Sequence, residues 1–187
     1  MKLILRFSAL TLGLLVLAAC SPNSTGPGTL IGELRGDARG CPAIGVLEHA
    51  VDITVFQPGK GRDLTDVEYE GEFRGVGTSC DYDEDDRLIE AEASFKILAR
   101  RGPAARNSQI ELPIFVAIVA AGGEIVDKRQ YPVLLKFDEG TEVAQVADTL
   151  EDIKIYLERG DSTRSYEILI GFQLSESQLA YNRSRQR

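Results

Sequence analysis

The sequence has no tryptophan and a single histidine, His49, among its 187 residues. A Ser-His-Asp or Cys-His site requires a histidine beside its nucleophile, and no Gly-x-Ser-x-Gly segment is present. No Cys-x-x-Cys pair occurs, which disfavours a zinc site. Gly59-Lys60-Gly61 lacks the Ser or Thr that follows the lysine of a phosphate-binding loop. We therefore predict a protein that is not an enzyme and holds no cofactor or metal, with a hydrolase using paired carboxylates as an alternative.

Basic residues are also fewer than acidic residues, with 21 Lys and Arg against 29 Asp and Glu. Lys2 and Arg6 are the charges of the first 19 residues, so the remaining chain carries a net charge of −10. Phosphate backbones and anionic lipid surfaces attract basic proteins. The composition therefore predicts no nucleic-acid partner and no binding to an anionic membrane surface through charge.

The N-terminal segment has the organisation of a targeting signal. Lys2 and Arg6 precede a charge-free apolar run over residues 8–17, which is short for a transmembrane helix of about 20 residues. The run ends in Leu17-Ala18-Ala19-Cys20, which resembles the lipobox of bacterial lipoproteins. An ordinary signal peptide that ends near a cysteine is the alternative.

The lipobox resemblance implies that residues 1–19 are a signal peptide and that Cys20 becomes the lipidated N-terminus. Several acyl chains hold a protein firmly, since each buried CH₂ contributes ~0.8 kcal/mol. Ser21 follows the cysteine, which in the enterobacterial sorting rule favours the outer membrane. We expect a lipid anchor at the periplasmic face of the outer membrane, with residues 20–40 as a flexible glycine- and proline-rich linker.

Two further cysteines, Cys41 and Cys80, form an even pair in a compartment that permits disulfides. We predict that they are bonded, which by the chain-entropy model stabilises a closed loop of ~40 residues by ~4 kcal/mol. Two buried thiols are the alternative. Residues 41–187 are long enough for one folded domain.

Within that domain, alternating apolar and polar residues predict about seven strands. We expect an all-β fold, an antiparallel β-sandwich of immunoglobulin- or fibronectin-like layout, with a closed barrel as the alternative. Pro113 suggests an edge strand or a bulge. Ser175-x-x-Gln178 predicts the capping box of a short C-terminal helix ending near Asn182, followed by a frayed basic tail. The expected inward-facing rows are Val67, Tyr69, Gly71, Phe73 and Gly75; Ile89, Ala91, Ala93, Phe95 and Ile97; and Ile110, Leu112, Ile114, Val116 and Ile118.

An acidic turn over residues 81–86 is a possible calcium ligand set. Asp81, Asp83 and Asp85 alternate, and Glu92 falls eleven residues after Asp81, as in an EF-hand loop. Asp86 stands where that loop requires glycine, and strand patterns flank the segment. We favour a solvated turn and keep a calcium- or ligand-binding module as the alternative function.

The loop after the strand 51–56 is a candidate docking segment. Arg62 and Asp63 lie between glycines and Leu64, close to Phe56. A charged loop beside a strand can bind a partner by contact or by strand addition. We predict Phe56, Arg62 and Asp63 as partner-docking residues, with an ordinary turn of the sandwich as the alternative.

The lipobox, Cys41-Pro42, Thr54-Val55-Phe56 and residues 61–67 (Gly-Arg-Asp-Leu-Thr-Asp-Val) together resemble small alphaproteobacterial outer-membrane lipoproteins. One class of these accompanies the β-barrel assembly (BAM) machinery. The resemblance implies a non-enzymatic accessory protein that binds another envelope protein and assists outer-membrane protein assembly. It implies no catalytic residues.

Overall fold

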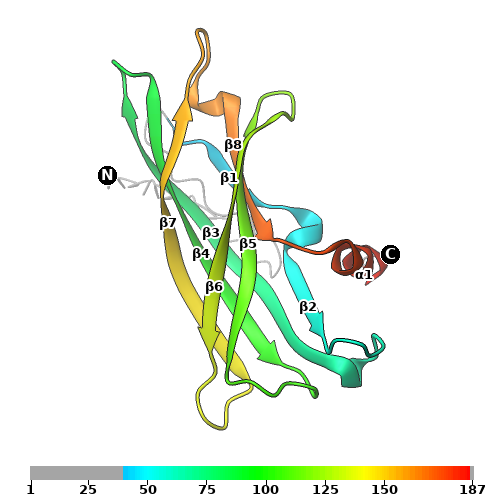
Figure 1. Cartoon of the computed structure of the whole chain (residues 1–187). Helices are drawn as coiled ribbons and strands as arrows, with labels where there is room; N and C mark the ends of the chain where they lie inside the picture. The colour runs from blue at the N-terminus through cyan, green and yellow to red at the C-terminus, as the bar shows by residue number, and fades with distance from the viewer. Residues whose placement is uncertain (1–39, 186–187) are drawn as a thin grey trace, which may run out of the picture.

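The computed structural model describes residues 40–185, which contain eight strands, three 3₁₀ turns and one α-helix (Figure 1). The predictions for residues 1–39, including the signal peptide and Cys20, lie outside the described residues. The elements are β1 Ala43–Val46, η1 Glu48–Ala50, β2 Asp52–Phe56, η2 Leu64–Asp66, β3 Val67–Asp83, β4 Leu88–Arg101, β5 Gln109–Ala120, β6 Ile125–Lys136, β7 Val143–Tyr156, η3 Thr163–Ser165, β8 Tyr166–Phe172 and α1 Glu176–Arg185.

The strands form two four-stranded sheets that pack face to face. One sheet has the order β1-β8-β5-β6 and the other β2-β3-β4-β7; β1 and β8 are parallel, and the other neighbours are antiparallel. The predicted all-β sandwich with a short C-terminal helix is confirmed. Its connections differ from the immunoglobulin order, because β2, β3 and β4 follow one another as a meander within one sheet.

The core lies between the two sheets and consists of the inward-facing residues of every strand. The rings of Phe73 on β3 and Phe172 on β8 meet across it, with centroids 4.8 Å apart. All the predicted inward residues of β4 and β5 are buried there. These rows were predictable because charged and apolar residues alternate with a period of two, and only one register buries the apolar set.

The prediction that Gly75 of β3 faces inward is wrong. Val67, Tyr69, Gly71 and Phe73 face the core, but the pairing of β3 with β4 shifts register between Phe73 and Gly75. Such a bulge adds a residue and exchanges the two faces of the strand. Beyond it, the residues that pack on the core are Val76, Cys80 and Tyr82.

The acidic turn is also shorter than predicted. β3 extends to Asp83, so Asp81 and Asp83 are strand residues, and only Glu84–Arg87 form the turn to β4. The register pairs Asp81 with Glu90 and Asp83 with Leu88, which shows that the hairpin continues to the turn. The acidic run from Asp81 to Asp86 concealed this extension, although Asp81 and Asp83 lie on the exposed face of the strand.

Pro113 does not mark an edge strand, because β5 lies between β8 and β6. It is tolerated because it lies opposite Pro132 of β6 and at the end of β8. Gln173, just beyond β8, donates its N–H to the Pro113 carbonyl oxygen at 2.8 Å. Proline has no N–H to donate to a neighbouring strand. Its position beside the end of β8 suits it, because β8 leaves the sheet there.

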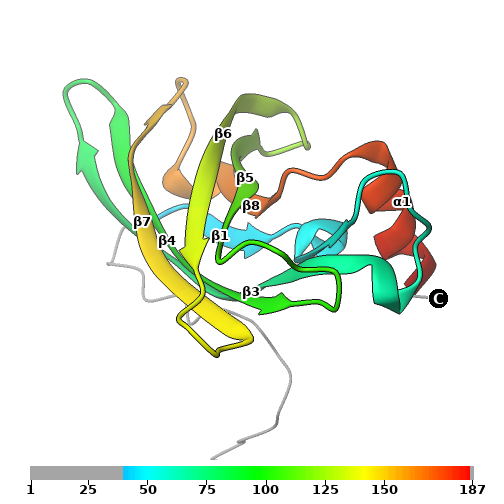
Figure 2. The same cartoon turned by 60° about the horizontal axis from the view of Figure 1, so that its bottom comes forward.

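Helix α1 begins with the predicted capping box. The Gln178 N–H donates to Ser175 Oγ at 3.3 Å, and the Ser175 N–H donates to Gln178 Oε1 at 2.9 Å. The helix runs to Arg185 rather than Asn182, and Arg185 is engaged in contacts rather than frayed. Figure 2 shows α1 beside η1 and the loop between β2 and β3.

The predicted disulfide is present. Cys41 and Cys80 are bonded, with their Cα atoms 5.7 Å apart. Cys41 precedes β1, an edge strand that was missed because it is four residues long and contains Gly45. The bond therefore links the start of one sheet to β3 of the other.

Candidate functional site

Two of the three predicted docking residues contact α1 of their own chain. The Phe56 and Tyr181 rings meet edge to face with centroids 5.0 Å apart, and Arg62 Nη1 donates to the Ser177 carbonyl oxygen at 3.1 Å. The Asp63 carbonyl oxygen accepts the Asp66 N–H at 2.9 Å, which forms the turn η2. The loop therefore holds α1, and the large apolar side chain that it leaves exposed to a partner is Leu64, at 76% exposure.

Asn182 fastens α1 to the sandwich. Its side chain is 1% exposed, and its amide nitrogen donates to the carbonyl oxygens of His49 at 3.0 Å and Asp52 at 2.8 Å. The same nitrogen lies 3.1 Å from Asp52 Oδ1. A buried amide is costly without partners, so these bonds fix the helix in one position against β2.

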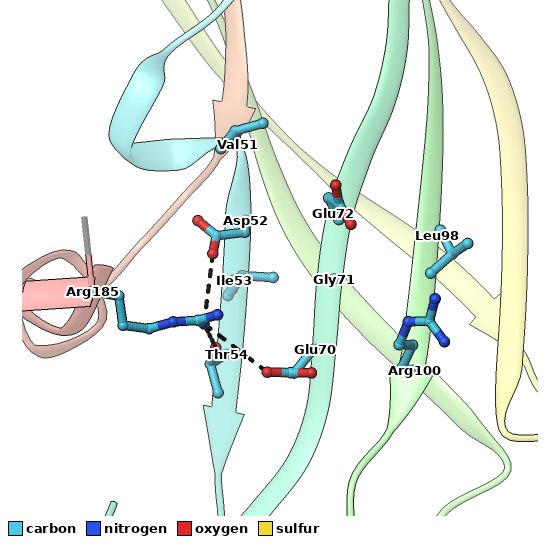
Figure 3. A pocket seen from close by; sticks show the side chains of 10 residues that line it. All are labelled: Val51, Asp52, Ile53, Thr54, Glu70, Gly71, Glu72, Leu98, Arg100 and Arg185. Carbon is cyan, nitrogen blue, oxygen red and sulfur yellow. Dashed lines mark hydrogen bonds and ion pairs between the residues drawn. The ribbon is translucent and has the colours of Figure 1, made fainter. Parts of the chain in front are cut away.

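A charged hollow of about 320 Å³ lies beside the end of α1, on the outer face of the β2-β3-β4-β7 sheet (Figure 3). Arg185 overhangs it from the helix, while Arg100 lies across the hollow on β4. The carboxylates between them come from β2 and β3. The lining residues are Val51, Asp52, Ile53, Thr54, Glu70, Gly71, Glu72, Leu98, Arg100 and Arg185.

The ion pairs that Arg185 makes in this hollow are long and partly exposed. Arg185 Nη1 lies 3.7 Å from Asp52 Oδ2 and 4.0 Å from Glu70 Oε1, and it donates to Thr54 Oγ1 at 3.4 Å. Exposed pairs of this kind contribute about 0–1 kcal/mol. The charged groups can therefore exchange these partners for those of a bound molecule at little cost.

A second hollow of about 260 Å³ shares Glu70 and Arg100 with the first. It adds apolar surface, because Leu64 and the 37% exposed Val143 line it together with Pro103. The two hollows together form what we call the outer-face groove, which extends from α1 across the sheet to the start of β7. A groove that combines charged and apolar side chains suits a peptide segment with both kinds of side chain.

The register of the β3–β4 hairpin explains how the two halves meet. Glu70 and Arg100 are direct cross-strand neighbours, and both face outward. In a regular hairpin, residues at equal distances from the turn face each other, so this pair could have been predicted from the sequence. The bulge between Phe73 and Gly75 shifts that register. Asn182, Tyr181 and Arg185 gave no such signal in the sequence, because their partners lie about 130 positions away.

The acidic segment does not gather ligands for a cation. Asp83 Oδ1 accepts the N–H groups of Asp85 at 2.9 Å and Asp86 at 3.2 Å, as in an ordinary turn. Within residues 40–185, no three His, Cys, Asp or Glu side chains are placed to hold a metal ion. The alternative of a calcium-binding module at Asp81, Asp83 and Asp85 therefore has no ligand cluster to support it.

Three side chains elsewhere on the sandwich have raised pKa values. The hydrogen bond from Tyr166 to Asp161 raises the pKa of Tyr166. The hydrogen bond with Glu90 raises the pKa of Lys154, and the charge of Asp127 raises that of Arg129.

Comparison with known proteins places the chain in no family. No family model, no curated protein and no solved structure matches it. None of the helices within residues 40–185 has the length and apolar character that crossing a bilayer requires.

Proposed function

We propose that the chain is a lipoprotein anchored through Cys20 to the periplasmic face of the outer membrane. Its β-sandwich acts as a non-enzymatic accessory protein that binds another envelope protein during outer-membrane protein assembly. The lipobox and the BAM-lipoprotein resemblance motivate the anchor and the process. The Cys41–Cys80 disulfide is consistent with a periplasmic domain, because such bonds persist in oxidising compartments.

The observation that carries partner binding is the outer-face groove with Leu64 at its rim. A single exposed leucine is ordinary on a protein surface, but Leu64 adjoins Val143 and the charged pair Glu70 and Arg100. Apolar contact then provides affinity, and the charges provide specificity. The partner segment presents an apolar side chain to Leu64 and Val143 and charged groups to Glu70 and Arg100.

The anchor is tested by metabolic labelling with radioactive palmitate. The full chain should incorporate label and fractionate with the outer membrane, whereas Cys20→Ser should do neither. A labelled Cys20→Ser protein, or a mature chain that begins elsewhere than Cys20, would contradict the anchor without bearing on the groove.

Partner binding is tested by a photo-crosslinking amino acid at Leu64 in the native envelope. We expect a discrete crosslinked species, identified by mass spectrometry as an envelope protein of the assembly machinery. The same probe at Ala121, an exposed turn residue between β5 and β6 at the opposite end of the sandwich, is the control (Figure 1). Crosslinking from neither position, or equally from both, would contradict the groove as a docking site.

A further inference from the structure

The outer faces of the two sheets differ in chemistry. On the β2-β3-β4-β7 sheet, outward positions of β3 and β4 are charged, among them Glu68, Glu70, Glu90 and Glu92. On the β1-β8-β5-β6 sheet, the pairing register aligns mostly apolar or small residues in rows across the outer face. Two of these rows are Gly45, Leu169, Ala117 and Lys128, and Ala43, Glu167, Val119 and Ile125.

This apolar face ends at β6, whose outer edge pairs with no other strand of the described part of the chain. Pro113 and Pro132 lie opposite each other and have no N–H groups, so theirs is a non-hydrogen-bonded pair. Bonded and non-bonded pairs alternate along an antiparallel ladder. The backbone groups of Lys128 and Gln130, which share the phase of Pro132, therefore point away from β5 and are open to another strand.

Side chains on β6 favour an occupant for this edge. Ile125 and Leu134 are 60% and 57% exposed, which are high values for large apolar residues. Lys128 lies 4.4 Å from the centroid of the Phe115 ring, on the outer face. Lys128, Arg129 and Lys136 outnumber the single acid Asp127, so β6 is a basic strand on an acidic protein.

The basic side chains of β6 favour some binding partners of this edge over others. Pairing of β6 with a second copy around Lys128 and Gln130 would bring two lysines and two arginines together, and like charges opposite one another destabilise a sheet. An anionic bilayer is disfavoured by the net negative charge of the whole protein. An acidic strand avoids the clash of like charges, because a carboxylate would lie opposite Lys128, and unlike a bilayer it supplies backbone groups to pair with the edge.

We propose that β6 binds an extended acidic segment of a partner protein by strand addition. The segment forms backbone hydrogen bonds with Lys128 and Gln130. On the outer face, where Lys128, Ile125 and Leu134 share one row, the segment places a carboxylate beside Lys128 and apolar side chains beside Ile125 and Leu134. This surface is separate from the outer-face groove, so either can be disproved without the other.

The test measures the binding of labelled peptides to the full chain in detergent by fluorescence anisotropy. The probes are a peptide of alternating valine and glutamate, its valine–lysine counterpart, and a valine–glutamate peptide with N-methyl groups along one edge. The acidic peptide should bind about tenfold more tightly than either of the others, because each lacks a charge match or edge hydrogen bonds. Equal binding of all three, or binding of none, would overturn the proposal.

Two substitutions at Gln130 distinguish the contribution of its backbone N–H to binding from that of its side chain. Gln130→Pro removes an N–H that points away from β5, and it should weaken acidic-peptide binding about tenfold. Gln130→Ala keeps that N–H and should bind within about twofold of wild type. Lys128→Glu should weaken the acidic peptide and strengthen the basic one, which remains decisive if Gln130→Pro fails to fold. A concentration-dependent dimer abolished by Lys128→Glu would assign the edge to a second copy and overturn the proposal.

Discussion

Gly102 shows how one missing methyl group shapes the site. It follows β4, and its N–H donates to the Glu68 carbonyl oxygen at 2.8 Å. A Cβ at this position would lie 2.1 Å from the carbonyl oxygen of Val67, a backbone atom that cannot move alone. Gly102→Ala should therefore lower the free energy of unfolding by about 1–3 kcal/mol, as overpacking does, measured by urea denaturation.

Gly75 is the matched control for that substitution. It lies at the bulge of β3, and a Cβ there would meet nothing within 4 Å. Gly75→Ala should leave stability unchanged or raise it by about 0.4–1 kcal/mol, because alanine restricts the unfolded chain. If Gly102→Ala and Gly75→Ala unfold at the same urea concentration, the steric argument is wrong.

Tyr166 makes stability depend on pH at the alkaline end. Its hydroxyl donates to Asp161 Oδ2 at 2.7 Å, which raises its pKa in the folded protein above the ordinary value of about 10. Above pH 10 the unfolded chain releases this proton before the folded chain does, so stability falls as pH rises.

Tyr166→Phe tests that linkage. At pH 7 it should cost about 0.5–1.5 kcal/mol for the lost hydrogen bond. The difference from wild type should shrink at pH 10.5 and above, as measured by urea denaturation at both pH values. Tyr156→Phe removes a 66% exposed phenol and should match wild type at pH 7. A Tyr166→Phe difference that stays constant or grows with pH would contradict the assigned bond.

Among the elements, those with a regular alternation were predictable. The inward rows of β4 and β5 follow from a period of two, and α1 follows from a capping box whose partners are three residues apart. The bulge at Gly75, the strand β1 and the central place of Pro113 depend on which strands become neighbours. That pairing is set by long-range packing, which local patterns do not contain.

The same distinction applies to the candidate site. The loop from Phe56 to Asp66 was recognisable as unusual from its glycines and charges, but its main contact is with α1. The groove itself is formed by β2, β3, β4, the end of α1 and the start of β7. A site assembled from segments so distant in sequence is visible only after the sheet is built.

Helix α1 depends on one buried amide for its position. Asn182→Asp would remove the donor to His49 and Asp52 and place a carboxylate among their oxygens. We expect a loss of about 2–3 kcal/mol in the stability of the helix against the sandwich. Hydrogen exchange measured by mass spectrometry should show residues 176–185 losing protection while β3 and β4 keep theirs.

Arg183→Ala is the control for the helix prediction. Arg183 is exposed on the same helix, so its replacement should leave the exchange of α1 unchanged. Should Asn182→Asp leave α1 fully protected, the helix would be held chiefly by Phe56 and Tyr181. Loss of protection throughout the sandwich would instead show that α1 is needed for the whole fold.

At the scale of the whole molecule, the disulfide joins two sheets that face each other across a core of packed side chains. Cys41 precedes the four residues of β1, and Cys80 lies 39 positions further along the chain, on β3. A cross-link over that distance restricts the unfolded chain, and the chain-entropy model gives about 4 kcal/mol. For a domain of this size, that corresponds to a melting temperature higher by roughly 8–16 °C.

Replacing both cysteines, as Cys41→Ala with Cys80→Ala, should therefore lower the melting temperature by that amount. Reduced wild-type protein should melt close to the double variant, because both lack the same cross-link, and the reductant should leave the double variant unchanged. Hydrogen exchange should show β1 losing protection before β8, since β1 retains only a four-residue parallel pairing. A double variant that melts with oxidised wild type would mean that the packing of the two sheets alone determines the stability of the domain.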